Sequence, residues 1–64
     1  MKRKRLLEHL TENECVLYRE GGNHSMFHNT KNGKQTAVPR HADIVEVTAF
    51  NICKQLGIPK PKIN

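Results

Sequence analysis

The first apolar residues of the chain recur at helical spacing. Leu6, Leu7 and Leu10 fall at positions i, i+1 and i+4, and the residues around them are charged or polar. On a helix these leucines share one side, so the pattern predicts an amphipathic helix over residues 2–13. Asn13 suits the end of such a helix.

A second apolar stripe at helical spacing predicts a helix over about residues 44–56. Asp43 and Glu46 have the spacing of a capping box at its start, and Gly57 can supply a left-handed cap at its end. Prolines beyond this cap prevent the helix from resuming, so we expect residues 59–64 to form a flexible tail. The stripe consists of Val45, Ala49, Ile52, Cys53 and Leu56.

Between the two helices, short runs of β-forming residues are separated by turn signals. A Gly-Gly pair at 21–22 marks the first turn, because glycine tolerates the positive φ angles of a tight hairpin connection. An Asn-Gly pair at 32–33 marks the second turn and is the strongest hairpin signal in the chain. The predicted strands cover residues 15–20, 24–29 and 35–39.

The first strand indicates how the sheet faces the helices. Alternation places Cys15 and Leu17 on the side toward the helices, and Val16 and Tyr18 on the opposite side. We expect a core built from the inner side of the sheet and the two helical stripes. Its expected members are Leu6, Leu10, Leu17, Ala49, Ile52, Cys53 and Leu56.

The predicted order, α-β-β-β-α, defines an α+β fold. Consecutive strands joined by short turns form a three-stranded antiparallel sheet, and two helices packed on one face of it complete a two-layer structure. The chain has 64 residues, so we expect residues 1–64 to make a single small domain.

Charge narrows the class of partner. The net charge is +5 and the pI is about 9.6, which suits nucleic acid, an acidic protein or an anionic membrane surface. A membrane is disfavoured, because no apolar run approaches the roughly 20 residues of a spanning helix. The basic residues 2–5 do not open a signal peptide either, since Glu8 interrupts the apolar run after Leu6 and Leu7. We therefore expect no membrane partner.

One histidine stands where a turn meets a strand. His24 follows the Gly-Gly turn and opens the second predicted strand, which is a rigid place to hold a reactive imidazole. The unperturbed pKa of histidine lies near neutrality, so this side chain can accept and donate protons at cellular pH. A lone histidine in a surface turn is more often merely polar, so the rest of the chain has to decide between the two interpretations.

The chain as a whole resembles the HicA-type toxins, the small ribonuclease half of bacterial toxin–antitoxin pairs. The resemblance rests on the order and spacing of short motifs across nearly the whole chain, after a basic first helix. These motifs are Arg-x-x-Gly from Arg19 to Gly22, Gly-x-His at Gly22-Asn23-His24, Val-Pro-x-His at Val38-Pro39-Arg40-His41, and the closing helix motif at Ile52-Cys53-Lys54-Gln55-Leu56-Gly57-Ile58.

The resemblance implies the fold of a double-stranded-RNA-binding domain, which has the same α-β-β-β-α order. It also implies that His24 is the catalytic residue and that the activity is cleavage of messenger RNA in the cytoplasm, which inhibits translation. The implied partner is a HicB-type antitoxin that binds the toxin and masks the active site. We expect a monomer when the toxin is alone and a hetero-oligomer with the antitoxin.

Three positions depart from the family pattern. Asn23 replaces the usual Ser or Thr, so any role of that hydroxyl is lost or passes to an amide. Ser25 stands where a second histidine is frequent, and Val47-Thr48 replaces a common Gly-Thr. None of these changes removes His24.

Cleavage of this kind needs few protein groups. RNA carries its own nucleophile, because a base that removes the 2′-hydroxyl proton lets that oxygen attack the adjacent phosphorus. We expect no cofactor and no metal: Cys15 and Cys53 are not in a C-x-x-C pair and act as small buried hydrophobes, and His24 and His28 diverge along a strand. The candidate RNA-binding residues are Lys2, Arg3, Lys4, Arg5, Asn23, His28, Lys31, Lys34 and Arg40.

The roles of two other histidines, and two alternative functions, have to be weighed against this interpretation. His28 would stand roughly 13 Å from His24 along the strand, too far to serve the same phosphate, so we expect it to contact RNA or solvent. His41 follows Pro39 in a loop, where it either approaches the site or hydrogen-bonds a backbone carbonyl; we favour the second, and His41 is the next catalytic candidate after His24. A non-catalytic double-stranded-RNA-binding module has the same fold and charge, and a basic adaptor would bind only an acidic protein. The Gly-x-His element favours the nuclease over both.

Overall fold

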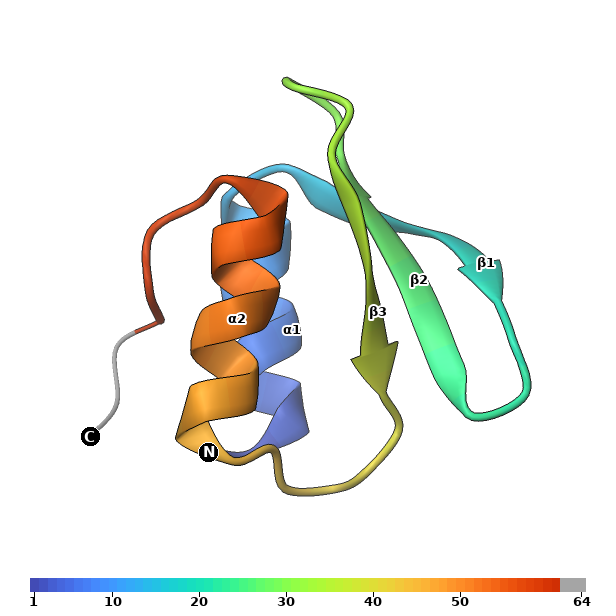
Figure 1. Ribbon diagram of the computed structural model, residues 1–64, viewed down its shortest axis with the longest axis vertical. Helices are drawn as coiled ribbons and strands as arrows, with labels where there is room; N and C mark the ends of the chain where they lie inside the picture. The colour runs from blue at the N-terminus through green and yellow to red at the C-terminus, as the bar shows by residue number, and fades with distance from the viewer. Residues whose placement is uncertain (62–64) are drawn as a thin grey trace.

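The computed structural model describes residues 1–61 of the chain (Figure 1). Its elements follow the predicted α-β-β-β-α order. They are helix α1 (Arg3–Glu12), strands β1 (Cys15–Glu20), β2 (His24–Asn29) and β3 (Gln35–Pro39), and helix α2 (Glu46–Leu56). The strands have the predicted bounds, and α1 is one residue shorter at each end than predicted.

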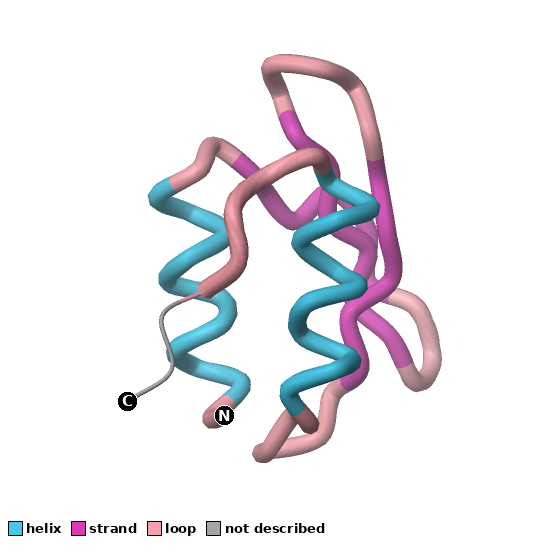
Figure 2. Tube along the Cα trace, turned by 60° about the vertical axis from the view of Figure 1, so that its left-hand side comes forward, coloured by secondary structure: helices cyan, strands magenta, loops and turns pink. Residues whose placement is uncertain are grey.

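The strands form one antiparallel sheet in the order β1-β2-β3. The two helices lie side by side on one face of this sheet, and both begin at the same end of the molecule (Figures 1 and 2). We call this face of the sheet the inner face and the opposite one the outer face, which no helix or strand of residues 1–61 covers. The predicted two-layer α+β fold is confirmed.

Strand β2 shows which side chains the helices cover. Ser25, Phe27 and Asn29 are buried on the inner face, and they alternate with more exposed residues on the outer face. The core therefore lies between the inner face and the helices, and it contains every predicted member except Leu17. The buried apolar residues are Leu6, Leu10, Cys15, Phe27, Val38, Ile44, Ala49, Ile52, Cys53 and Leu56.

The prediction that Leu17 is buried is wrong, because its side chain is 48% exposed. Cys15 is the one buried residue of β1, which runs along the edge of the sheet and away from the helices (Figure 1). A β-bulge between Leu17 and Arg19 interrupts the pairing of this strand with β2. Strict alternation along β1 therefore fails in its second half.

The capping box predicted at the start of α2 does not form. The helix begins at Glu46, two residues later than predicted, and no side chain caps its first turn. Asp43 pairs instead with Lys2, through a backbone bridge and a salt bridge of 3.3 Å. Met1 and Ile44 exchange two hydrogen bonds of 2.7 and 2.8 Å. Because this pairing keeps the segment before α2 extended, Asp43 cannot fold back over the helix.

The end of α2 is capped as predicted. Gly57 adopts a left-handed conformation with a φ of 71°. The side-chain amides of Asn29 and Asn32 both donate hydrogen bonds to the carbonyl of Leu56, at 2.9 and 3.1 Å. These bonds join the end of the helix to the β2–β3 hairpin.

Residues 59–61 of the predicted tail contact the helices. The carbonyl of Pro59 lies 2.7 Å from Nε2 of His9 on α1. The ammonium of Lys60 stands 5.1 Å from the centre of the Phe50 ring, and Pro61 is buried. Residues 62–64 of the predicted tail lie outside the described residues.

Candidate functional site

His24 is the first residue of β2 and is exposed on the outer face. The connection from β1 spans residues 21–23, and a 2.8 Å hydrogen bond from the Gly21 amide to the His24 carbonyl closes it. Neither Gly21 nor Gly22 has a positive φ, so the predicted reason for this pair is wrong. A Cβ on Gly21 would stand 3.2 Å from the His24 carbonyl, so close packing is what favours glycine there.

Arg40 holds this turn from the end of β3. Its guanidinium donates to the carbonyls of Gly21 and Gly22, at 2.7 and 3.2 Å. The same group forms a salt bridge of 3.1 Å with Glu20, the last residue of β1. Hydrogen bonds from Ser25 and Arg40 lower the pKa of the Glu20 carboxyl, which stays ionised beside the guanidinium. The backbone next to His24 is therefore fixed by a charged side chain.

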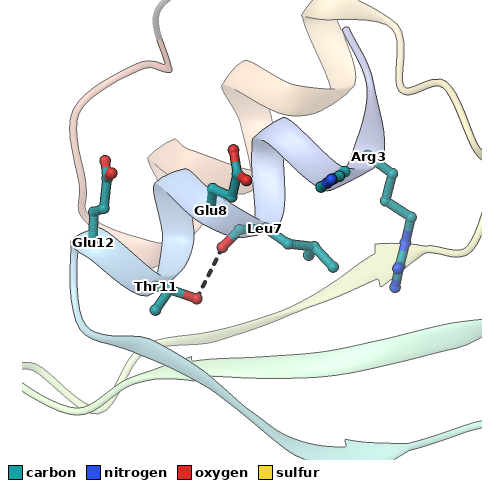
Figure 3. Close-up of a pocket in the computed structure, with 6 residues that line it drawn as sticks. Arg3, Leu7, Glu8, Thr11 and Glu12 are labelled. Atoms are coloured by element: carbon teal, nitrogen blue, oxygen red, sulfur yellow. Dashed lines mark hydrogen bonds between the residues drawn. The ribbon is translucent and has the colours of Figure 1, made fainter.

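Arg3 secures the same end of the sheet from the helix side. It reaches from α1 across to the strands (Figure 3), where Nε donates to the Pro39 carbonyl at 2.8 Å and Nη2 donates to Ser25 Oγ at 3.0 Å. Pro39 is the β3 partner of His24 in the sheet register, and Ser25 is its neighbour in the chain. Arg3 and Arg40, both predicted as RNA-binding residues, are thus used to position the strand ends around His24.

The other predicted RNA-binding lysines and arginine do not gather around His24. Lys2 pairs with Asp43, and Lys31 pairs with Glu14 at 3.4 Å. Lys31 and Lys34 belong to the β2–β3 hairpin, at the opposite end of β2 from His24 (Figure 1). Lys4 and Arg5 are exposed in the first turn of α1, in the layer behind the sheet.

The predicted residues that do share a surface with His24 are Asn23 and His28. Asn23 is exposed in the turn, next to His24 in the chain. His28 lies on the outer face, as its four-residue spacing predicts, and packs against Tyr18 of β1 with the ring centres 5.4 Å apart. Four residues of strand still separate the two imidazoles by about 13 Å.

Arg19 is a neighbour of His24 that sequence reasoning missed. The bulge sets Arg19 opposite Met26, which lies on the outer face two residues from His24. Residues directly opposite in an antiparallel pair share a face, and diagonal neighbours stand roughly 7–8 Å apart. Alternation counted from Cys15 assigns Arg19 to the inner face. In the sequence, the only signal for it is its place in the Arg-x-x-Gly motif.

A shallow groove of about 820 Å³ lies along α1 (Figure 3). Leu7 and Thr11 form part of its wall, and the Thr11 hydroxyl donates to the Leu7 carbonyl at 3.0 Å. Glu8 and Glu12 line it together with basic residues, so its charge is mixed and poorly suited to a polyphosphate. Its lining contains none of the four histidines; it consists of Arg3, Lys4, Leu7, Glu8, Thr11 and Glu12.

No three histidine, cysteine or carboxylate side chains among residues 1–61 come together in a way that could hold a metal ion. Neither helix of this part of the chain is long and apolar enough to cross a membrane. Cys15 and Cys53 are buried free thiols in the core, as predicted.

Comparison with models of known protein families assigns the chain to a family. The family model for the HicA toxin of bacterial toxin–antitoxin systems matches residues 3–58, which include every helix and strand of the fold. The chain belongs to the HicA toxin family. No curated protein and no solved structure gives a significant match. As a HicA toxin, the protein is the toxic half of a toxin–antitoxin system and pairs with an antitoxin.

Proposed function

We propose that this HicA toxin is an endoribonuclease that cuts messenger RNA without a metal ion, with His24 as its catalytic residue. The observation that carries the proposal is the placement of His24: it is exposed on the uncovered outer face, at a turn fixed by Arg3 and Arg40. An accessible imidazole on a rigid backbone is what proton transfer to and from a bound RNA requires.

In this mechanism, Nε2 or Nδ1 of His24 removes the proton from a ribose 2′-hydroxyl. The 2′-oxygen then attacks the adjacent phosphorus, and the bond from phosphorus to the 5′-oxygen of the next nucleotide breaks. The products are a 2′,3′-cyclic phosphate and a 5′-hydroxyl, whose proton comes from solvent or from the imidazolium. A positioned histidine typically contributes about 10²–10⁴ to the rate of such a step.

Arg19 is the cation best placed to stabilise the extra negative charge that develops on the phosphate. It lies on the outer face diagonally across from His24, and it forms no salt bridge with any residue of 1–61. Its guanidinium is free to make two parallel hydrogen bonds with phosphate oxygens. Arg3 and Arg40 act on the backbone instead, as positioning residues.

Within this proposal the system is of type II, and the antitoxin is a protein of the HicB type that covers His24. The toxin works in the cytoplasm, where its messenger RNA substrate is found. The net charge of +5 supports a polyanionic substrate. A double-stranded-RNA-binding module of the same fold would use the same charge without cutting, so a cleavage assay separates the two functions.

The test is incubation of the purified toxin with an end-labelled transcript, with and without EDTA. We expect fragments ending in 2′,3′-cyclic phosphates, at the same rate in both samples, because 2′-hydroxyl attack needs no metal. A mobility shift without fragments would identify a binding module instead. Cleavage that is lost in EDTA and restored by a divalent cation would contradict the mechanism.

A further inference from the structure

The outer face carries an aromatic pair that packing does not explain. Tyr18 on β1 is 45% exposed, and its ring lies 5.4 Å from the ring of His28 on β2, with an angle of 56° between the planes. Both rings lie outside the core: His28 is on the outer face of β2, and Tyr18 packs against it there. Within residues 1–61, the aromatic ring that each of them contacts is the other one.

The bulge in β1 accounts for the placement of this pair. Tyr18 is the residue left without a register partner, between Leu17 and Arg19. The extra residue changes the direction in which the following side chains point. Bulges beside binding sites often have this effect. Tyr18 and Arg19 thus both reach the outer face. Tyr18 lies next to His28, and Arg19 lies on the side toward His24.

We propose that Tyr18 and His28 form a base-stacking subsite for single-stranded RNA on the outer face of the sheet. The proposal deepens the proposed nuclease function and rests on it. One unpaired base stacks on the solvent-exposed side of this ring pair, while Arg19 and His24 face the backbone further along β2. At about 13 Å from His24, the pair binds a base near the cut and not the nucleotide whose 2′-hydroxyl reacts.

The chemistry of the outer face favours RNA as the occupant. The strand residues that point outward include Arg19, His24 and His28 but no carboxylate, because Glu20 lies opposite the buried Ser25 on the inner side. Aromatic rings stack on any unpaired base, since every base has a flat π-face. An A-form duplex keeps its bases stacked inside and cannot offer one. The subsite is therefore specific for single strands.

The chain provides its own optical probe of this subsite. Tyr18 is its single tyrosine and there is no tryptophan, so the intrinsic emission of the protein comes from Tyr18. The experiment uses the His24→Ala protein, which keeps the RNA intact, and titrates it with a short fluorescently labelled single-stranded RNA. Anisotropy of the label gives the Kd, and tyrosine emission reports stacking. A hairpin duplex of the same composition is the matched ligand.

We expect the single strand to quench Tyr18 with the same Kd that anisotropy gives, and the duplex to leave the emission unchanged. Tyr18→Leu should raise the Kd for the single strand by roughly 5- to 150-fold, the range that the loss of one stacked base corresponds to. Tyr18→Phe should keep the affinity within about twofold, because the ring and not the hydroxyl stacks. Val47→Ala, at an exposed valine on α2, is the control and should change nothing.

Binding without quenching, together with an unchanged Kd for Tyr18→Leu, would overturn the subsite and leave the nuclease proposal standing. Loss of antitoxin binding in Tyr18→Leu, with RNA affinity intact, would assign the pair to the antitoxin and also overturn it. Absence of RNA binding by the His24→Ala protein and of cleavage by the wild type would overturn both proposals. Because Tyr18 is half-exposed, its replacement should not unfold the domain, and a melting curve of each variant checks this.

Discussion

At the scale of single residues, the cations near His24 divide into two kinds. Arg3 donates hydrogen bonds to the Pro39 carbonyl and the Ser25 hydroxyl, and Arg40 donates to the carbonyls of the β1–β2 turn. Arg19 makes no such bond with the described residues and lies on the same face as His24. Charge alone does not distinguish these roles, and the contacts of each guanidinium do.

Replacing Arg19 by Gln should slow cleavage at saturating RNA by at least about tenfold, because a charged hydrogen-bond donor to the developing phosphate charge is lost. Arg19→Lys should restore part of the rate, since it keeps the charge but not the paired donors. The melting temperature should stay within a few degrees of wild type, as expected for an exposed side chain. Single-turnover kinetics make the measurement, with Arg5→Gln on α1 as the control.

If Arg19→Gln and Arg5→Gln slow the reaction equally, Arg19 contributes only through the general field of the protein. Its assignment beside the scissile phosphate would then be wrong.

At the scale of elements, local pattern predicts existence and bounds well, and tertiary contacts decide the rest. The sequence predicts the bounds of the three strands because the Gly-Gly and Asn-Gly turns separate them. The facing of Leu17 and Arg19 could not be predicted, because alternation assumes an unbroken ladder and the bulge breaks it. The predicted start of α2 is wrong because Asp43 pairs with Lys2, which is remote from it in the sequence.

In the candidate site, too, the sequence predicts some features and tertiary packing decides the others. His24 was accessible to sequence reasoning because a turn, a strand start and a family motif coincide on it. Among the nine RNA-binding candidates, local sequence predicts that Asn23 and His28 lie on the His24 side, but the positions of the seven lysines and arginines depend on how α1 and the hairpins pack, which no local pattern encodes. In the folded chain, Arg3 and Arg40 form hydrogen bonds that position the strand ends around His24. Lys31 and Lys34 lie at the opposite end of β2.

The cap of α2 gives a prediction at this scale. Gly57→Ala should lower stability by about 1–3 kcal/mol, because the residue has a φ of 71° and a new Cβ would stand 2.8 Å from Asn32 Nδ2. For a domain of this size, each kcal/mol corresponds to a fall of roughly 4–8 °C in melting temperature. Gly22→Ala is the matched control, since its Cβ would meet nothing within 4 Å and its φ is not positive. Equal melting temperatures for the two variants would refute this account of the cap.

At the scale of the whole molecule, a small core holds both cysteines. Burial raises the pKa of the Cys15 thiol. The pKa of the Cys53 thiol is raised to about 11, mainly by burial and to a smaller extent by the charge of the nearby Cys15. A thiol whose folded pKa exceeds its unfolded value stabilises the fold below the unfolded pKa. That contribution is lost as the pH rises from about 9 toward 11.

We therefore expect both thiols of the native toxin to resist a thiol-specific reagent at pH 8, where the unfolded chain reacts at both cysteines. The physical reason is twofold: the side chains are inaccessible, and the reactive thiolate is scarce. A colorimetric thiol titration with and without denaturant makes the measurement. Rapid labelling of a native thiol would show that the core opens on the timescale of the assay.

The central claim is that His24 carries the proton in RNA cleavage, and the most direct measurement is the cleavage rate of a folded His24→Ala protein. We expect the rate to fall by about 10²–10⁴ or below detection, with the melting temperature, RNA affinity and antitoxin binding close to wild type. His28→Ala, four residues along the same face, should keep most of its rate at saturating RNA. If folded His24→Ala protein cuts the transcript at the wild-type rate, the assignment is contradicted, and His41 becomes the residue to test.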